Sequence, residues 1–204
     1  RDDISFTANG GEVLALMGEN GAGKSTLLKV LNGDYQQTSG EYLVNGEPCH
    51  FNSPREAVAA GIGVIYQERQ IMLELTVGEN IFLGRLPTGF MGRIKMREVH
   101  SRAQAIIDEF GLDMKSTDKV KDLSVAYQQM VEIMKAYSRE NLKMIAFDEP
   151  TASLSDSEID SLFRIIRKLK AEGKVIIYVS HRMAEIRQIA DRVAIFKDGR
   201  FVGD

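Results

Sequence analysis

The sequence predicts an α/β fold with a largely parallel sheet, a small antiparallel β annex and a helical subdomain. Short, continuously apolar runs alternate with segments of helical periodicity, and runs without a polar face are typical of parallel strands covered on both sides. An Asn-Gly pair between two short strand-like stretches indicates a tight hairpin outside that alternation. With 204 residues, 44% of them hydrophobic, the chain is long enough to bury one substantial core.

Five apolar runs are the predicted strands of the sheet. They lie at residues 13–17, 62–66, 144–147, 175–179 and 193–196. The antiparallel annex is expected between Glu41 and Phe51, with its turn at Asn45 and Gly46. The order of the runs along the chain, with helical segments between them, therefore predicts one doubly covered sheet with one small addition.

The clearest helix signal lies at residues 155–172. Ser155 and Glu158 form a capping box, and Gly173 provides a stop signal. Apolar residues fall on one helical face, at Ile159, Leu162, Phe163, Ile166 and Leu169.

Residues 83–95 are rich in glycine and contain Pro87, so they are a predicted loop, and residues 97–110 are a predicted helix that opens a helical lobe. We therefore expect a single domain over residues 1–204, with a core at about 1–82 and 141–204 and a helical subdomain at about 83–140.

Composition excludes several classes of function. The chain has 26 Lys and Arg against 29 Asp and Glu, a net charge of −3, and no run of five basic residues, so nucleic acid is not an expected partner. Cys49 is the one cysteine and cannot form an internal disulfide, and no Cys and His cluster has zinc spacing. No stretch approaches 18 apolar residues, so membrane association is expected to come through a partner protein.

A phosphate-binding loop follows the first predicted strand and opens a helix that extends through Asn32. It fits G-x-x-x-x-G-K-[ST], with Thr26 next in the chain: Gly18, Glu19, Asn20, Gly21, Ala22, Gly23, Lys24 and Ser25. The glycines let backbone N–H groups surround a phosphate at a helix N-terminus. Lys24 would reach the β- and γ-phosphates and Ser25 would hold Mg²⁺. The alternative is a plain glycine-rich turn, but the flanking strand and helix favour a P-loop NTPase core.

The predicted strand at 144–147 ends in two acids. Asp148 lies where an α/β sheet places its ligand and suits Mg²⁺ coordination, and Glu149 can orient or deprotonate an attacking water. Taken alone, Asp-Glu-Pro at a strand end is more often a turn. Its pairing with the Lys24 loop favours the catalytic interpretation.

Four further segments resemble those of ATP-binding-cassette proteins. Gln67 resembles the Q-loop glutamine, Leu123 to Gln128 occupies the place of the family signature, residues 152–155 stand where the D-loop should be, and His181 resembles the switch histidine. Singly, Gln67 could be a solvated polar residue, Ser124 an N-cap and His181 a surface histidine. Their family order around the two nucleotide motifs, over essentially the whole chain, favours the functional interpretation.

The resemblance implies ATP and Mg²⁺ as cofactors and assigns roles to several residues. Glu149, His181 and Gln67 would be catalytic; Ser25, Gln67 and Asp148 would bind the metal; and Ser124 would contact ATP bound to a second cassette. The segments from Met17 to Lys24, Phe147 to Leu154, Tyr178 to Met183 and Phe196 to Arg200 look most similar to bacterial pentose or hexose importers, specifically to the first of two fused cassettes.

For such a protein we expect ATP hydrolysis to energise sugar import. The implied partners are a second cassette, membrane permease subunits and, indirectly, a periplasmic sugar-binding protein. The implied location is the cytoplasmic face of the inner membrane, as a peripheral protein. The chain starts 17 residues before Gly18, which suggests that the strand carrying the adenine-stacking aromatic precedes Arg1 and that the chain is a fragment.

Some residues depart from the family pattern. Ala126 and Tyr127 replace the second glycine and the glutamine of the usual signature, and a methyl group there could hinder approach to a phosphate. The usual D-loop aspartate position holds Ser155, with Asp156 one residue on. Two alternatives therefore stay open: a soluble cassette ATPase acting on ribosomes or DNA, and a nucleotide-binding module with impaired turnover. The short interval between Gln67 and Leu123 argues against DNA-repair clamps.

Overall fold

The computed structural model describes residues 4–19, 23–197 and 200–203, and the side chains of residues 200–203 are not included. The chain divides into two compact units. The core unit comprises Arg1–Gln67, Asn141–Ala152 and Ile166–Asp204, and the helical unit comprises Glu68–Glu140 and Ser153–Ile165. The subdomain expected at residues 83–140 falls within the helical unit.

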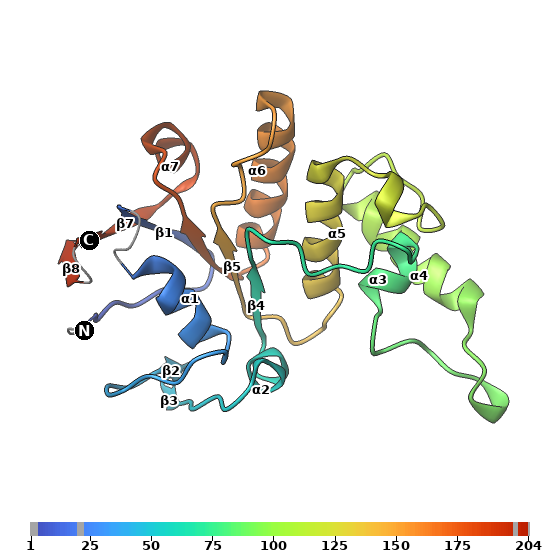
Figure 1. Ribbon diagram of the computed structural model, residues 1–204, viewed down its shortest axis with the longest axis horizontal. Coiled ribbons are helices and arrows are strands. Elements are labelled where there is room, and N and C mark those ends of the chain that lie inside the picture. Colours follow the sequence, from blue (N-terminus) through green and yellow to red (C-terminus); the bar gives the residue numbers. More distant parts are fainter. Residues whose placement is uncertain (1–3, 20–22, 198–199, 204) are drawn as a thin grey trace. The chain divides into compact units, whose positions relative to one another are not determined.

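A mostly parallel sheet lies at the centre of the core unit (Figure 1). Its strands are β1 (Glu12–Gly18), β4 (Ile62–Ile65), β5 (Met144–Asp148), β6 (Val175–Val179), β7 (Arg192–Lys197) and β8 (Arg200–Gly203). They are ordered β4-β5-β6-β1-β7-β8, and the pairs within β4 to β7 are parallel, whereas β8 pairs antiparallel with β7. The α/β prediction is confirmed, and β8 is an addition that the sequence did not indicate.

The predicted annex is a two-stranded antiparallel hairpin. It pairs β2 (Leu43–Val44) with β3 (Glu47–Pro48), as expected from the turn signal between them. Asn45 and Gly46 both have positive φ, 53° and 78°, which is the backbone that a tight type I′ turn requires. The local turn chemistry thus explains why this short pairing forms.

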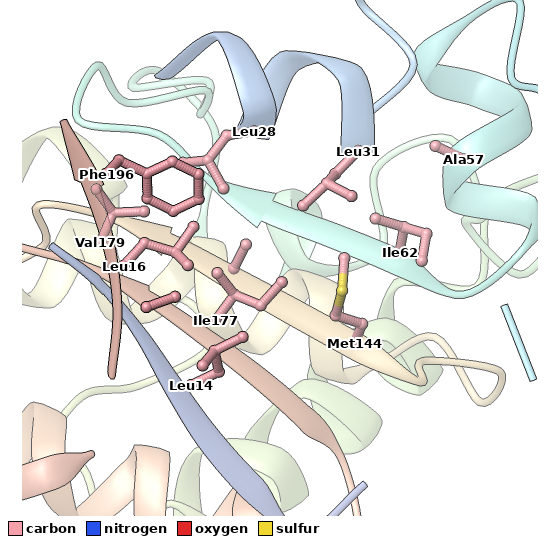
Figure 2. Close-up of a cluster of buried hydrophobic side chains, with 12 residues drawn as sticks. Leu14, Leu16, Leu28, Leu31, Ala57, Ile62, Met144, Ile177, Val179 and Phe196 are labelled. Carbon is pink, nitrogen blue, oxygen red and sulfur yellow. The ribbon is translucent and has the colours of Figure 1, made fainter. Parts of the chain in front are cut away.

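Helices α1 (Lys24–Leu31), α2 (Pro54–Ala59) and α7 (Met183–Ile189) belong to the core unit. Leu28 and Leu31 of α1 pack onto the sheet in one buried cluster with Leu16, Ile177 and Phe196 (Figure 2). All five side chains are at most 6% exposed. This packing holds α1, which begins at Lys24, against the sheet.

The helical unit contains α3 (Val77–Ile81), α4 (Met96–Glu109), α5 (Val125–Tyr137) and two 3-10 turns, η1 (Phe90–Gly92) and η2 (Val120–Asp122). The helix predicted at 97–110 corresponds to α4, whose buried face carries Val99, Ala103 and Ile107. None of the described helices is both long enough and apolar enough to cross a membrane.

Helix α6 (Asp156–Ala171) corresponds to the prediction at 155–172. Its capping box is present: the Ser155 hydroxyl accepts from the Glu158 N–H at 3.4 Å, and the Glu158 carboxylate accepts from the Ser155 N–H at 3.1 Å. Of the predicted apolar face, Leu162, Phe163, Ile166 and Leu169 are at most 1% exposed.

Candidate nucleotide site

The carboxyl ends of four neighbouring parallel strands meet at one edge of the sheet. In register, Leu16 of β1 and Asp148 of β5 both pair with Val179 of β6, and β4 runs alongside β5. Loops that leave this edge carry the residues singled out in the sequence, which is where open α/β sheets bind their ligands. Gln67 follows β4 and His181 follows β6, so the fold brings both to the edge that also carries the phosphate-binding loop.

The described part of the phosphate-binding loop comprises Gly18, Glu19 and Gly23 to Thr26. Gly23 precedes α1 with φ 102°, a left-handed backbone conformation that an L side chain would strain. Lys24 is only 5% exposed, and its Nζ donates to the Gly18 carbonyl at 2.5 Å. Ser25 and Thr26 are exposed on the first turn of α1, as is Glu19 just after β1. Asn20, Gly21 and Ala22 lie outside the described residues.

Asp148 ends β5 and Glu149 follows it, so two carboxyl groups are adjacent at the end of this strand. Burial raises the pKa of Asp148, and the neighbouring Glu149 raises it further, while Lys24 and Lys29 act in the opposite direction. Glu149 has φ 45°, an uncommon backbone for a residue with a Cβ, and its N–H donates to the Val179 carbonyl at 2.9 Å. This conformation turns the chain directly after the strand.

Glu149 and His181 are in direct contact. The His181 Nδ1 lies 3.0 Å from the Glu149 Oε1, so a proton on Nδ1 is donated to the carboxylate. The Glu149 side chain is 19% exposed and that of His181 is 55% exposed. A hydrogen-bonded, partly accessible pair of acid–base groups thus lies at the sheet edge.

A hydrogen-bonded cluster surrounds the buried carboxyl group of Glu185, and we call Glu185 with the buried Thr151, Tyr178 and Ser180 and the exposed Arg182 the Glu185 cluster. Glu185 is 7% exposed and accepts from the Thr151 hydroxyl at 2.7 Å and from the Tyr178 hydroxyl at 3.0 Å. The Ser180 hydroxyl and the Arg182 guanidinium donate more weakly, both at 3.4 Å. Burial together with the Glu185 carboxylate raises the pKa of Tyr178.

The Glu185 cluster ties together the two segments that carry Glu149 and His181. Thr151 comes two residues after Glu149, whereas Ser180 and Arg182 flank His181. The sequence did not reveal this role, because single polar residues after a strand and in a short helix look the same as surface residues. The spacing alone gives no signal that their side chains converge on one buried carboxylate.

Gln67 itself is exposed, and the residue before it is firmly held. The Tyr66 hydroxyl donates to Asp34 Oδ2 at 2.6 Å, and burial and this bond raise the Tyr66 pKa. Within the helical unit, Glu132 of α5 accepts from the Gln70 N–H at 2.5 Å and is 6% exposed. Its burial raises the pKa of Glu132 to about 7, against the opposing effects of Gln70, Arg69 and Lys135. The segment after Gln67 is therefore anchored on α5.

The signature segment lies in the helical unit, where Ser124 caps α5. The Ser124 hydroxyl accepts from the Tyr127 N–H at 3.2 Å. Ala126 is 1% exposed, so its methyl group faces the interior of the unit, and the side chain exposed on the first turn is Val125, at 43%. The methyl group of Ala126 therefore does not face the exposed side of this helix end. Gln128 also supports the segment, since its Nε2 donates to the Val120 carbonyl at 3.0 Å.

Among the described residues, no three His, Cys, Asp or Glu side chains converge as a metal cluster. Of the candidate oxygen ligands Ser25, Gln67 and Asp148, only Asp148 belongs to these four residue types. Such a mixed set suits a cation that keeps water or phosphate oxygens among its ligands, as Mg²⁺ does.

A strand, a glycine-rich loop and a helix that carries a buried lysine, together with an acidic strand end at the same sheet edge, define a nucleotide-binding domain of the P-loop class. The ABC transporter family matches residues 1–152, and the chain belongs to this family. It is 52% identical over 201 residues to the arabinose import ATP-binding protein AraG of Yersinia pestis, and 49% identical over 200 residues to that of Pectobacterium atrosepticum.

Those alignments cover 98% of this chain but only 38% and 39% of the two relatives. Among solved structures, the chain is similar to a nucleotide-free ATP-binding cassette from an ABC transporter, with a TM-score of 0.83 and 25% identity over 99% of this chain and 83% of that one. A cassette named MJ1267 gives a TM-score of 0.85 and 27% identity over 99% of this chain and 83% of that one.

Proposed function

We propose that the chain binds ATP with Mg²⁺ and hydrolyses it to drive the import of a sugar through membrane permease subunits. The main support for ATP hydrolysis is the contact between Glu149 and His181, which lies at the same sheet edge as the Lys24 loop. An acid–base pair beside a phosphate-binding loop has the composition that phosphoryl transfer to water requires.

Residues 18–26 would bind the phosphates of ATP. The backbone N–H groups of the loop, including those of Asn20, Gly21 and Ala22, would surround the phosphates at the N-terminus of α1, where the helix dipole favours anions. Lys24 is already buried against the loop through the Gly18 carbonyl, so its ammonium can turn to the β- and γ-phosphates with a small movement.

Ser25, Gln67 and Asp148 are the residues that would hold Mg²⁺. All three offer oxygen, the ligand type that Mg²⁺ prefers. The raised pKa of Asp148, beside the Glu149 carboxyl, also fits a site completed by a cation, because a nearby positive charge would favour the ionised form. When bound, the ion would neutralise phosphate charge.

Glu149 is the proposed general base, and His181 the group that orients it. The left-handed turn at Glu149 and its N–H bond to Val179 fix the backbone, while His181 holds the carboxylate from the other side. A carboxylate held in this way can orient a water molecule and accept its proton. His181 remains exposed enough to contact a γ-phosphate.

The site is completed by a second cassette, whose segment equivalent to the one at Ser124 would close over the ATP. In return, Ser124 and the N-terminus of α5 of this chain would contact ATP held by that partner. The first turn of α5 carries no acidic residue, which supports this because an acidic side chain there would repel phosphate.

The sugar proposal is supported by the relatives whose printed name is arabinose import ATP-binding protein. We propose arabinose as the transported sugar, a permease and a periplasmic binding protein as partners, and a peripheral location on the cytoplasmic face of the inner membrane.

The test is uptake into vesicles that contain the full-length protein and its permease, with the binding protein and labelled sugar outside and ATP at the cassette side. We expect ATP-dependent uptake of arabinose but not of ribose, and none with Lys24→Ala. Uptake that is independent of ATP, or unaffected by Lys24→Ala, would contradict the transport function. Uptake of ribose in place of arabinose would contradict only the choice of sugar.

A further inference from the structure

We propose that residues 88–95 of the helical unit form a tip that inserts into the surface of an anionic phospholipid membrane. The segment lies between α3 and α4 and projects away from both (Figure 1, green). The inference rests on the proposed function in one respect, the location at a membrane, whereas lipid contact itself can be measured without ATP turnover or sugar uptake.

The tip has a defined backbone rather than the open loop expected from its glycines. Thr88 and Ile94 form an antiparallel bridge, and below it the Lys95 N–H donates to the Pro87 carbonyl at 2.9 Å. Above it the Gly89 N–H donates to the Arg93 carbonyl at 2.7 Å. These bonds close a small hairpin with the 3-10 turn η1 at its end.

Two large apolar side chains stand at the end of this hairpin. Phe90 is 88% exposed and Met91 is 85% exposed, the two highest values among the exposed large hydrophobic residues of the described chain. Met91 has φ 58°, a left-handed conformation that is uncommon for a residue with a Cβ. A Cβ added at the next residue, Gly92, would meet no atom within 4 Å, so there is open space beside the end of the tip.

Basic residues surround the apolar pair. Arg93, Lys95 and Arg97 are all exposed, and the chain has no acidic residue between Glu79 and Glu98. Glu98 lies 3.8 Å from the Lys95 ammonium, so it offsets one of these positive charges. The Lys95 side chain lies beside Gly89, since its Cε is 3.1 Å from where a Cβ on that glycine would be. The local charge is therefore positive although the whole chain has a net charge of −3.

This combination matches the chemistry of an anionic leaflet. Phe90 and Met91 would enter the boundary between headgroups and acyl chains, and the basic residues would meet the phosphates around them. A protruding tip of two adjacent apolar residues suits a soft surface that deforms around it. A stable protein interface, in contrast, buries an area of about 800 Å² on each partner, which is much more than two side chains offer.

The test uses Phe90→Trp, because residues 1–204 contain no tryptophan and the difference in emission from the unsubstituted protein therefore reports on the tip. Phosphatidylcholine vesicles with phosphatidylglycerol should shift its emission to shorter wavelength, and vesicles of phosphatidylcholine alone should do so much less. Leu73→Trp is the matched control, because Leu73 is an exposed apolar residue elsewhere in the same unit, and its emission should not move.

Binding is then measured by flotation of the protein with the same vesicles. Phe90→Ser combined with Met91→Ser should weaken partition by about tenfold or more. Arg93→Glu with Lys95→Glu should weaken it by a similar factor, and this factor should shrink at high salt. Lys115→Glu with Lys121→Glu, which changes two other exposed lysines of the unit, should have little effect.

Unchanged Phe90→Trp emission with anionic vesicles, or equal loss of partition in the tip and control variants, would overturn the proposal. So would an emission shift that appears only when permease is present in the vesicles, because the tip would then bind a protein. ATP hydrolysis by the same preparations distinguishes the two proposals, since tip variants that lose vesicle binding should keep their hydrolysis rate.

Discussion

Glu185→Ala should destabilise the protein strongly, because Glu185 is the shared acceptor of a buried cluster. The substitution removes charge-assisted hydrogen bonds from Thr151 and Tyr178, which are 2% and 0% exposed. Each such bond contributes about 1.5–3 kcal/mol, so the free energy of unfolding should fall by about 3–5 kcal/mol. For a chain of this length that corresponds to a decrease in Tm of about 10 °C.

The assay is thermal and urea denaturation followed by circular dichroism, with ATP hydrolysis measured at a temperature at which the variant is folded. ATP hydrolysis should also fall, because the Glu185 cluster holds the residues on either side of His181 and the segment just after Glu149. Glu98→Ala is the matched control: its ion pairs with Lys95 and Arg102 are exposed and 3.8 Å long, so its loss should cost less than about 1 kcal/mol. Equal stability of Glu185→Ala and Glu98→Ala would refute the reasoning.

Two further predictions concern the helical unit and the pairing of cassettes. Burial raises the pKa of Glu132 from 4.5 to about 7. Between these two pH values the folded protein keeps a proton on Glu132 that the unfolded protein has lost. The free energy of unfolding should therefore fall by up to about 3 kcal/mol as the pH rises from 4.5 to 7. Glu132→Gln should remove that part of the pH dependence, as measured by urea denaturation across this range. In the full-length protein with its proposed partners, Lys24→Ala should abolish most ATP hydrolysis and sugar uptake. Ser124→Arg should reduce them distinctly less, because the signature segment, in which Ala126 and Tyr127 depart from the family pattern, completes the other nucleotide site.

A distinct result would contradict each of these two predictions. A Glu132→Gln protein whose stability varies with pH as the wild type does would show that Glu132 does not titrate in this range. Equal losses from Lys24→Ala and Ser124→Arg would mean that the two sites are equivalent. Val125→Gly should improve hydrolysis at the partner's site if the exposed Val125 side chain is the source of hindrance, whereas Ala126→Gly should not, because Ala126 is buried.

The strands of the sheet could be predicted because burial on both faces gives them a continuous apolar sequence. The predicted bounds of Val175–Val179 match those observed, and those of the other four strands differ by at most one residue at each end. The short helices α2 and α3 have six and five residues, fewer than two turns, and so gave no periodicity to detect. The edge strand β8 was not predicted. It pairs only with β7, and an edge strand does not need the continuous apolar sequence that identified the other strands.

The sequence identified candidate residues of the site but not the side chains that hold them. Sequence motifs consist of residues that contact a ligand. Glu185 and Tyr66 instead contact other residues of the chain, and these contacts exist only in the folded structure. Glu132 did leave a signal, since an acid within the apolar run of α5 indicates a buried carboxyl that needs a donor. The donor, the Gln70 N–H, lies 62 residues away in the chain and could not be inferred.

The most direct test of the account is single-turnover hydrolysis of ATP by the full-length protein with its partners, comparing wild type with Glu149→Gln. A general base contributes about 10²- to 10⁴-fold, so the rate should fall by that factor. ATP affinity, measured by equilibrium binding to the same preparations, should be retained because Lys24 and the loop supply the phosphate contacts. A Glu149→Gln protein that hydrolyses ATP at the wild-type rate, or that loses ATP binding together with hydrolysis, would contradict the proposed site.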